Sequence, residues 1–425
     1  MSRMSLWPHK AVSIEARTER LVWVLAFAVL ICLRMPGILI HGRFWGEEGW
    51  SFHNAWTMPW YDALTVTYGG YVSLIPNLAG LLARHLAPLD YAPYVSTTLA
   101  LLIQVCPAIL LATARDEWLA GRIRLVAALL LLATPPASEE VWLATTQAQV
   151  HLALCTALIL ALEVRSGAME LFRLTLLLLA AFTGPGSWLL VPFFAFRAAN
   201  DRSWGRAVQA CVLAAGAIVQ LLFFFHMRPD RTFAGPRMQL LIFFVRHLLI
   251  PFLGHDRAVS IATPLHDAVV AANAPVWPMV LTVVAFGGLA IAIFWQKRGP
   301  AQWMFLAGGT LAVAGYSAAL HGTRGAAFLL YVDAEDRYSF APTVLFGLSL
   351  LAIASTRRGP LRVAASALVI WLILVGCHGY FARSGMRYAT GPDWRSEVAA
   401  WRADPNHPLA TWPPNWGLRL PPDAR

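Results

Sequence analysis

The sequence contains few charged residues for its length. Asp, Glu, Lys and Arg make up 13% of the 425 residues, whereas soluble globular proteins contain about 25%. Hydrophobic residues make up 58%, and the mean hydropathy is +0.57. A chain of this size with so little charge cannot cover a water-facing surface. The composition therefore excludes a soluble enzyme, a disordered chain and a secreted disulfide scaffold, and it predicts a polytopic membrane protein.

Alternating hydrophobicity, the pattern of a transmembrane barrel strand, is also missing. The apolar residues form continuous runs of about 20, which is the length of a membrane-spanning helix. Cysteine is scarce, and all five cysteines fall inside these runs. We therefore expect small packing residues rather than a disulfide or a zinc site. The predicted fold class is all-α, a polytopic bundle of transmembrane helices.

The apolar runs predict about eleven spans. Strong runs cover about 21–40, 93–114, 145–163, 207–226, 277–295, 302–320, 340–356 and 361–380, and weaker runs cover about 122–134, 172–183 and 186–197. Two further stretches, 74–86 and 238–253, are too short or are interrupted by Arg246. We interpret both as interfacial or re-entrant helices. Because an arginine inside the bilayer is costly, Arg246 is expected to face a phosphate, a carboxylate or water.

The distribution of charge predicts the orientation. With the N-terminus inside, the inner segments hold 17 of the 33 basic residues and 7 of the 23 acidic residues. The whole net charge of +10 then lies on the cytoplasmic side, as the positive-inside rule requires. The predicted location is the cytoplasmic membrane of a bacterium, with the C-terminus outside. No basic patch is left over that would indicate a nucleic-acid partner.

The loops divide the chain into two parts. Residues 1–380 form the predicted bundle, including a long first outer loop at 41–92, and residues 381–425 form an outer tail rich in Trp and Pro. The inner loops are short, so chemistry or recognition is expected on the long outer segments.

The tail is too short to build a core of its own. It is predicted to contain one helix. Asp393 and Ser396 suit a helix N-terminus, and Trp394, Val398 and Trp401 share one helical face. We expect this helix to lie on the membrane surface or to cover the cavity.

Two adjacent acids follow the first span. Glu47 and Glu48 lie between glycines and between Trp45 and Trp50. Carboxylates next to apolar aromatics at a membrane boundary are partly desolvated, which raises the pKa and suits a general base. The tryptophans suit stacking on a sugar ring or a place in the headgroup region. The alternative is that the two acids are only solvated polar residues at a helix exit.

This pattern resembles the C-type glycosyltransferases, polytopic enzymes such as protein mannosyltransferases, aminoarabinose transferases and oligosaccharyltransferases. They have two acids in the first outer loop and about a dozen spans. The run from Phe44 to Gly49 also looks like uncharacterised bacterial membrane proteins related to that superfamily. The resemblance covers the layout of about residues 20–200 and a few later motifs. Both acids here are Glu, where Asp is commoner in at least one position, so Glu47 and Glu48 both stay candidates for the base.

A second polar cluster covers the next outer turn. Glu139 and Glu140 precede Gln147 and His151, and the latter two share one helical face. Polar side chains in an apolar helix face a cavity or another helix. The four residues are therefore candidates for substrate contact, and the two acids could bind the acceptor or, together with Glu47, a divalent cation. Interhelical hydrogen bonds are the alternative.

A third cluster precedes the tenth span. Arg337 lies at the outer mouth of a predicted helix, where its guanidinium group suits a lipid-linked phosphate. The pair Arg337-Tyr338 also resembles the start of a late span in many of these enzymes. The alternative is a local salt bridge from Arg337 to Asp333 or Asp336.

Together these clusters predict an inverting glycosyltransferase. It would move a sugar from a polyprenyl-phosphate donor to a hydroxyl of a glycan, lipid or protein, with a glutamate as base. No cofactor is required beyond a possible divalent cation, because the phosphate leaving group is already present. The alternative is a lipid-linked saccharide flippase or polymer exporter without covalent chemistry, and a non-catalytic scaffold is a third interpretation.

Overall fold

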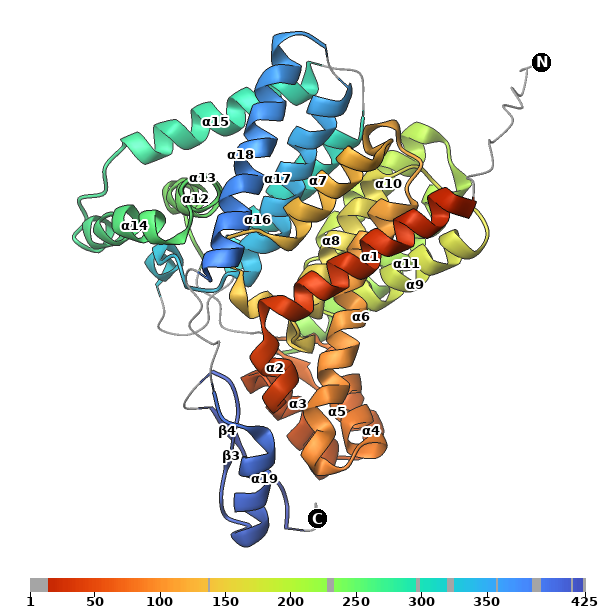
Figure 1. The fold of residues 1–425 in the computed structure, drawn as a ribbon, viewed down its shortest axis with the longest axis vertical. Helices are drawn as coiled ribbons and strands as arrows, with labels where there is room; N and C mark the ends of the chain where they lie inside the picture. Colours follow the sequence, from red (N-terminus) through yellow and green to blue (C-terminus); the bar gives the residue numbers. More distant parts are fainter. Residues whose placement is uncertain are drawn as a thin grey trace.

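The computed structural model is mostly helical, and its few strands form two short hairpins (Figure 1). It describes residues 14–136, 138–227, 233–295, 299–318, 325–356, 358–383, 391–413 and 416–422. The all-α class is confirmed. Six described helices are long and apolar enough to cross a membrane: Leu89–Thr113, Trp204–Met227, Pro236–Leu253, Trp277–Phe294, Arg337–Ser355 and Pro360–Ala382.

The first part of the chain alternates long helices with short ones. Its elements are α1 (Ile14–Arg34), α2 (Pro36–His41), α3 (Gly46–Thr57), α4 (Trp60–Thr65), β1 (Thr67–Tyr68), β2 (Tyr71–Val72), α5 (Leu74–Leu86), η1 (Leu89–Tyr91), α6 (Ala92–Thr113) and η2 (Glu117–Leu119). The middle part consists of α7 (Arg122–Ala133), η3 (Glu139–Val141), η4 (Thr145–Gln147), α8 (Ala148–Ala161), α9 (Ala168–Ala181), η5 (Trp188–Leu190), α10 (Val191–Asp201) and α11 (Trp204–Met227).

The last part holds most of the long helices. Its elements are α12 (Pro236–Phe243), a π-helical turn η6 (Phe244–Leu249), α13 (Ile250–Leu253), α14 (His255–Val270), α15 (Trp277–Phe294), α16 (Pro300–Ala318), η7 (Ala326–Leu330), α17 (Arg337–Thr356), α18 (Pro360–Ala382), α19 (Trp394–Ala403), β3 (Leu409–Ala410) and β4 (Gly417–Leu418).

Helix α8 lies at the centre of the bundle. Every side chain from Leu152 to Leu162 is buried, because α6, α9, α16 and α17 pack around it. A helix that is apolar on all sides is expected to be buried in this way. The main hydrophobic core forms around it, with buried residues from α1, α6, α7, α8, α9, α16 and α17.

The predicted number of spans is not confirmed. Four runs interpreted as spans form helices of 11 to 14 residues, α7, α8, α9 and α10. At 1.5 Å per residue such helices extend about 16–21 Å, less than the bilayer core of about 30 Å. Conversely, the sequence predicts that the stretch around Arg246 does not span, yet Pro236–Leu253 is long and apolar enough to do so. It crosses the direction of α17 and α18, since α12 and α13 are seen end-on in Figure 1.

Helices α3, α4, α5 and α19 gather with the β3–β4 hairpin at one end of the molecule, which we call the loop-rich end (Figure 1). The predicted tail helix is confirmed as α19. The Asp393 side chain caps it by accepting a hydrogen bond from the Ser396 backbone N–H at 3.0 Å. Its apolar stripe is buried: Trp394, Val398 and Trp401 are at most 1% exposed.

The tail shares a core with the first loop region rather than forming its own. Its stripe packs in one cluster with Phe44 and Phe52, and the rings of Phe44 and Trp394 meet edge to face at 5.1 Å. An ion pair between Arg402 and Asp90 joins the two parts again, at 2.6 Å. The C-terminal residues are thereby held against the start of α3.

Candidate functional site

The three polar clusters of the sequence meet at one cavity of about 560 Å³ at the loop-rich end. Glu47 reaches this cavity from the first turn of α3, Glu140 from η3 and Arg337 from the start of α17. The predicted site residues Trp45, Trp50 and Tyr338 line it as well. Segments far apart in the chain therefore bring carboxylates and a guanidinium group together.

Glu47 is the acid of the predicted pair that faces the cavity. Its Oε1 atom lies 3.4 Å from Nη1 of Arg337, and the two side chains are only 13% and 18% exposed. The Oε2 atom is buried and has no hydrogen-bond partner among the described residues. The hydrogen-bonding capacity of this oxygen is therefore unused within the described part of the protein.

Glu48 is turned into the protein and does not line the cavity. One oxygen accepts a hydrogen bond from the Trp45 backbone N–H at 2.8 Å. The other accepts from the Thr145 hydroxyl at 2.6 Å and from the Thr145 backbone N–H. Burial raises the pKa of Glu48, while these hydrogen bonds act in the opposite direction. Glu48 thus closes the N-terminus of α3 and ties it to η4.

The two glycines that flank the acidic pair leave room for the C-terminal β3–β4 hairpin to pack against α3. A Cβ atom on Gly46 would lie 2.2 Å from the ring of Trp416, and one on Gly49 would lie 3.1 Å from Leu418 and Thr411. These two positions are three apart and share a helical face. The tail packs on that face, which leaves Glu47 directed to the cavity.

Arg337 is surrounded by carboxylates. The Glu140 side chain accepts a hydrogen bond from its backbone N–H at 2.7 Å, and Glu335 forms an ion pair with its Nη2 atom. Its Nε donor is buried and has no partner among the described residues. Burial raises the pKa of Glu140, and the neighbouring negative charge of Glu335 adds to this effect. The sequence suggests Asp333 or Asp336 as ion-pair partners, but Glu335 and Glu47 take that place.

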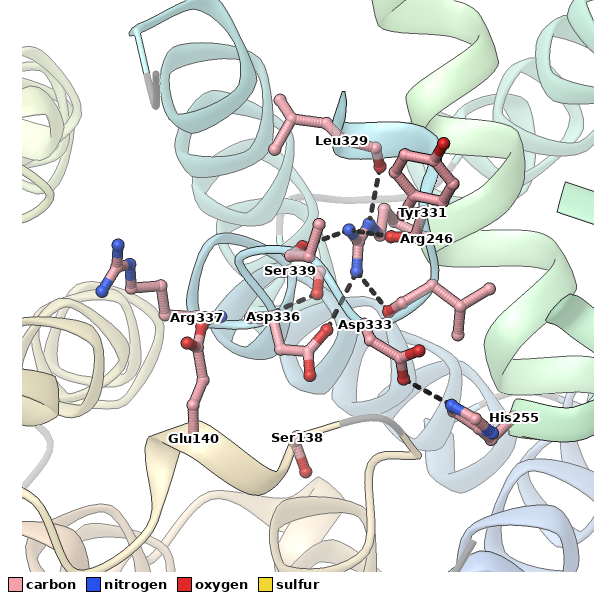
Figure 2. A network of polar contacts seen from close by, with 12 residues as sticks. Ser138, Glu140, Arg246, His255, Leu329, Tyr331, Asp333, Asp336, Arg337 and Ser339 are labelled. Atoms are coloured by element: carbon pink, nitrogen blue, oxygen red, sulfur yellow. Dashed lines mark hydrogen bonds and ion pairs between the residues drawn. The ribbon is translucent and has the colours of Figure 1, made fainter. Parts of the chain in front are cut away.

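Arg246 holds the loop before Arg337, as Figure 2 shows, and it does not line the cavity. It donates to Asp336 at 2.9 Å and to the backbone oxygens of Leu329, Tyr331, Val332 and Ala334. The side chain is 1% exposed. The expectation that a carboxylate compensates the buried charge is met, whereas the suggested contact with a phosphate is not supported because these donors are already used.

A second anchor holds the same loop. Nε2 of His255 on α14 pairs with Asp333 at 2.5 Å, and Nδ1 pairs with Asp256 at 2.8 Å. The hydrogen bond to Asp333 raises the pKa of His255 to about 9. The imidazolium is therefore the main form at neutral pH, and it balances the charge of Asp333. In Figure 2, Arg337 points away from both anchors.

Besides Glu48 and Arg246, three more predicted site residues lie outside the cavity lining. Gln147 and His151 are fully buried, and Nδ1 of His151 lies 3.1 Å from the Gln147 carbonyl oxygen. The His151 ring packs against both Trp142 and Phe340. Glu139 is 7% exposed and is absent from the lining.

Gln149 is a cavity residue that the sequence does not single out. It lines the cavity, and its Oε1 atom accepts a hydrogen bond from the Tyr71 hydroxyl at 3.3 Å. Its place in the same polar run as Gln147 is the available signal, but the choice between them depends on how α8 is rotated. Tyr68 belongs to the group of aromatic residues that follows the acidic pair in the sequence, and Trp416 to the Trp-rich tail; both line the cavity.

An apolar groove of about 200 Å³ adjoins the cavity. The two share Tyr71, Gln149, Arg337 and Tyr338. The remaining walls come from α8, η5, α11, α16 and α17 and are almost wholly apolar. Arg337 therefore lies where the polar cavity meets the apolar groove.

Among the described residues, no group of three or more His, Cys, Asp and Glu side chains is arranged to hold a metal ion. Comparison with known proteins finds no family model and no curated protein that matches the chain. The geometry of the cavity and its groove is thus the basis for a functional conclusion.

Proposed function

We propose that the protein is an inverting glycosyltransferase that takes a sugar from a polyprenyl-phosphate donor. The observation that carries the proposal is the meeting of Glu47 and Arg337 in one cavity, with an apolar groove opening beside Arg337. A donor of this class has three parts, a prenyl chain, a phosphate and a sugar. The groove, the guanidinium group and the polar chamber match them in that order.

The donor would be held by the groove and by Arg337. The prenyl chain would lie against the apolar walls of α8, α16 and α17, where burial contributes about 0.8 kcal/mol per CH₂ group. The phosphate would take the unused Nε donor of Arg337 together with a terminal nitrogen, because a guanidinium fork binds phosphate oxygens in pairs. It would displace Glu47 from its long contact and leave that carboxylate free.

The reaction would use Glu47 as the general base. Its carboxylate, once the phosphate has taken over Arg337, would accept the proton of the acceptor hydroxyl while the hydroxyl oxygen forms a bond to the anomeric carbon. The bond from that carbon to the phosphate oxygen breaks, and the electron pair stays on the phosphate, which Arg337 stabilises. Attack from the face opposite the leaving group inverts the anomeric configuration.

The neighbouring residues would position these two groups. Glu140 holds the backbone of Arg337, Arg246 and His255 hold the loop before it, and Glu48 holds the start of α3. None of the four needs to touch the substrate for this role.

The membrane setting belongs to the same proposal. The positive-inside distribution supports a cytoplasmic N-terminus and a bacterial cytoplasmic membrane, so the cavity would open on the outer face. Membership of the C-type superfamily is proposed from the acidic pair and the late Arg337-Tyr338 pair. The chain thus needs no nucleotide site.

The direct test is incubation of the purified protein in lipid nanodiscs with a panel of radiolabelled polyprenyl-phosphate sugars. We expect release of polyprenyl phosphate with at least one sugar, and loss of this release in Arg337→Gln. Trp204→Ala, an exposed position on α11 outside the cavity, is the matched control and should remain active. Movement of intact donor across proteoliposomes without cleavage of the phosphate bond would overturn the proposal in favour of a flippase.

A further inference from the structure

Three partly exposed aromatic side chains surround the solvent side of Glu47. Trp50, Tyr68 and Trp416 are 51%, 40% and 47% exposed. All three line the main cavity together with Glu47. They also line a second cavity of about 300 Å³, again together with Glu47. The aromatic group therefore stands between the two chambers, next to the proposed base.

The positions of these rings are set by the fold. Trp50 and Tyr68 meet edge to face with their centroids 5.9 Å apart. The ring of Trp416 lies against Gly46, where a Cβ atom would come within 2.2 Å of it. Its backbone is held in the hairpin, since its carbonyl accepts a hydrogen bond from the Thr411 backbone N–H at 3.0 Å. These faces are thus held in place before a ligand arrives, which lowers the entropy lost on binding.

Polar groups lie next to the rings. Ser51 and Asn54 line the main cavity, and His53 and Arg419 line the second one. Flat aromatic faces with hydrogen-bonding groups at their edges suit a ligand with apolar C–H faces and a rim of hydroxyls. A saccharide has this construction.

A place in the membrane headgroup region would also explain exposed aromatics. Trp60 and Tyr61 on α4 are exposed to 65% and 55% and line neither cavity. Such residues fit a headgroup role. Trp50, Tyr68 and Trp416 differ because they come from three separate segments and converge on one carboxylate.

We infer that Trp50, Tyr68 and Trp416 form the acceptor subsite and that the acceptor is a saccharide. Its terminal ring would stack on these faces and present a hydroxyl to the carboxylate of Glu47, which lines both cavities. The delivery of that hydroxyl rests on the proposed transferase function, whereas saccharide binding can be measured without any donor. The C-terminal tail is thereby part of the substrate site.

The test measures binding of soluble oligosaccharides to the full-length Glu47→Gln variant by isothermal titration calorimetry. The panel contains oligomers of glucose, mannose, galactose and N-acetylglucosamine. We expect binding of at least one of them, and about tenfold weaker binding in Trp50→Ala and in Trp416→Ala. Trp416→Phe keeps a flat ring and should restore most of the affinity. Trp60→Ala is the matched control and should bind as tightly as the parent.

The outcomes separate this inference from the proposed function. Saccharide binding without donor cleavage would retain the subsite and reject the transferase. Donor cleavage without binding of any oligosaccharide would reject the subsite, as would binding of Ser- and Thr-containing peptides in place of saccharides. Equal weakening in Trp60→Ala would also reject it. If Trp416→Ala does not fold, Trp50→Ala decides alone, because its ring is half exposed.

Discussion

The adjacent acids Glu47 and Glu48 have opposite environments, so matched substitutions should separate chemistry from stability. Glu47 keeps one oxygen without a partner at the cavity among the described residues, and Glu48 accepts three hydrogen bonds from Trp45 and Thr145. We expect Glu47→Gln to lower donor turnover by about 10²–10⁴-fold, the range for loss of a general base. Glu48→Gln should retain most of the turnover of the folded protein.

The stability of the alanine variants should show the reverse order. Glu48→Ala leaves three donors without their acceptor, two of them buried backbone N–H groups. Each buried unsatisfied donor costs about 1–3 kcal/mol, and loss of an N-cap contact costs about 1 kcal/mol, so we expect a loss of about 3 kcal/mol or more. Glu47→Ala loses one long ion pair at 3.4 Å, but Arg337 keeps its ion pair with Glu335, so we expect a smaller loss than in Glu48→Ala.

Two measurements check this pair of expectations. Single-turnover release of labelled polyprenyl phosphate gives the rates of the glutamine variants, and thermal unfolding in detergent gives the stabilities of the alanine variants. Full activity in Glu47→Gln would refute its role as the base. Loss of activity in Glu48→Gln at unchanged stability would move that role to Glu48 and refute the reasoning from hydrogen bonds.

Three further predictions concern the groove and the loop before Arg337. Gly315→Leu should displace about two CH₂ groups of the prenyl chain from the groove, at about 0.8 kcal/mol each. The KM should therefore rise about 15-fold for a long-chain donor but not for a short-chain donor. Equal effects on both donors would contradict binding of the chain in the groove. Arg246→Met leaves Asp336 as an unpaired buried charge, which costs about 3–5 kcal/mol, and the double variant with Asp336→Asn should recover part of that loss in thermal unfolding. The pKa of His255 is raised from about 6.5 to about 9 by Asp333, so this ion pair stabilises the fold fully below about pH 6.5 and ceases to do so as the pH rises through about 9. The melting temperature of wild type should therefore fall relative to His255→Gln over that window, and parallel curves would contradict the pairing.

Much of the helical content followed from local patterns. The apolar runs at 93–114, 207–226, 277–295 and 361–380 correspond to α6, α11, α15 and α18. The tail helix followed from a capping residue and a stripe at helical spacing, features that lie within a single turn or two of each other. The span count did not follow, because four apolar runs form helices shorter than a bilayer crossing requires, and one of these helices, α8, is surrounded by protein.

The residues of the candidate site were also predicted only in part. Glu47, Glu140 and Arg337 were recognisable as charged groups at the ends of apolar runs. Glu48, Arg246 and His151 are equally prominent polar residues in the sequence, yet the side chain of each makes its contacts with other protein groups. Residue type and spacing do not distinguish a side chain that faces a cavity from its neighbour on the next helical position, which points about 100° away.

Composition and hydropathy were sufficient for the class of protein, because the free energy of burying apolar runs depends on the residues of each run alone. The geometry of the cavity came from packing between segments up to several hundred residues apart. Only that packing places Trp416 against Gly46 and turns Glu47, and not Glu48, toward Arg337. The same packing surrounds Arg246 with four backbone carbonyl groups and one carboxylate. Contacts of this kind are absent from any local pattern, since the distances that define them exist only after the chain has folded.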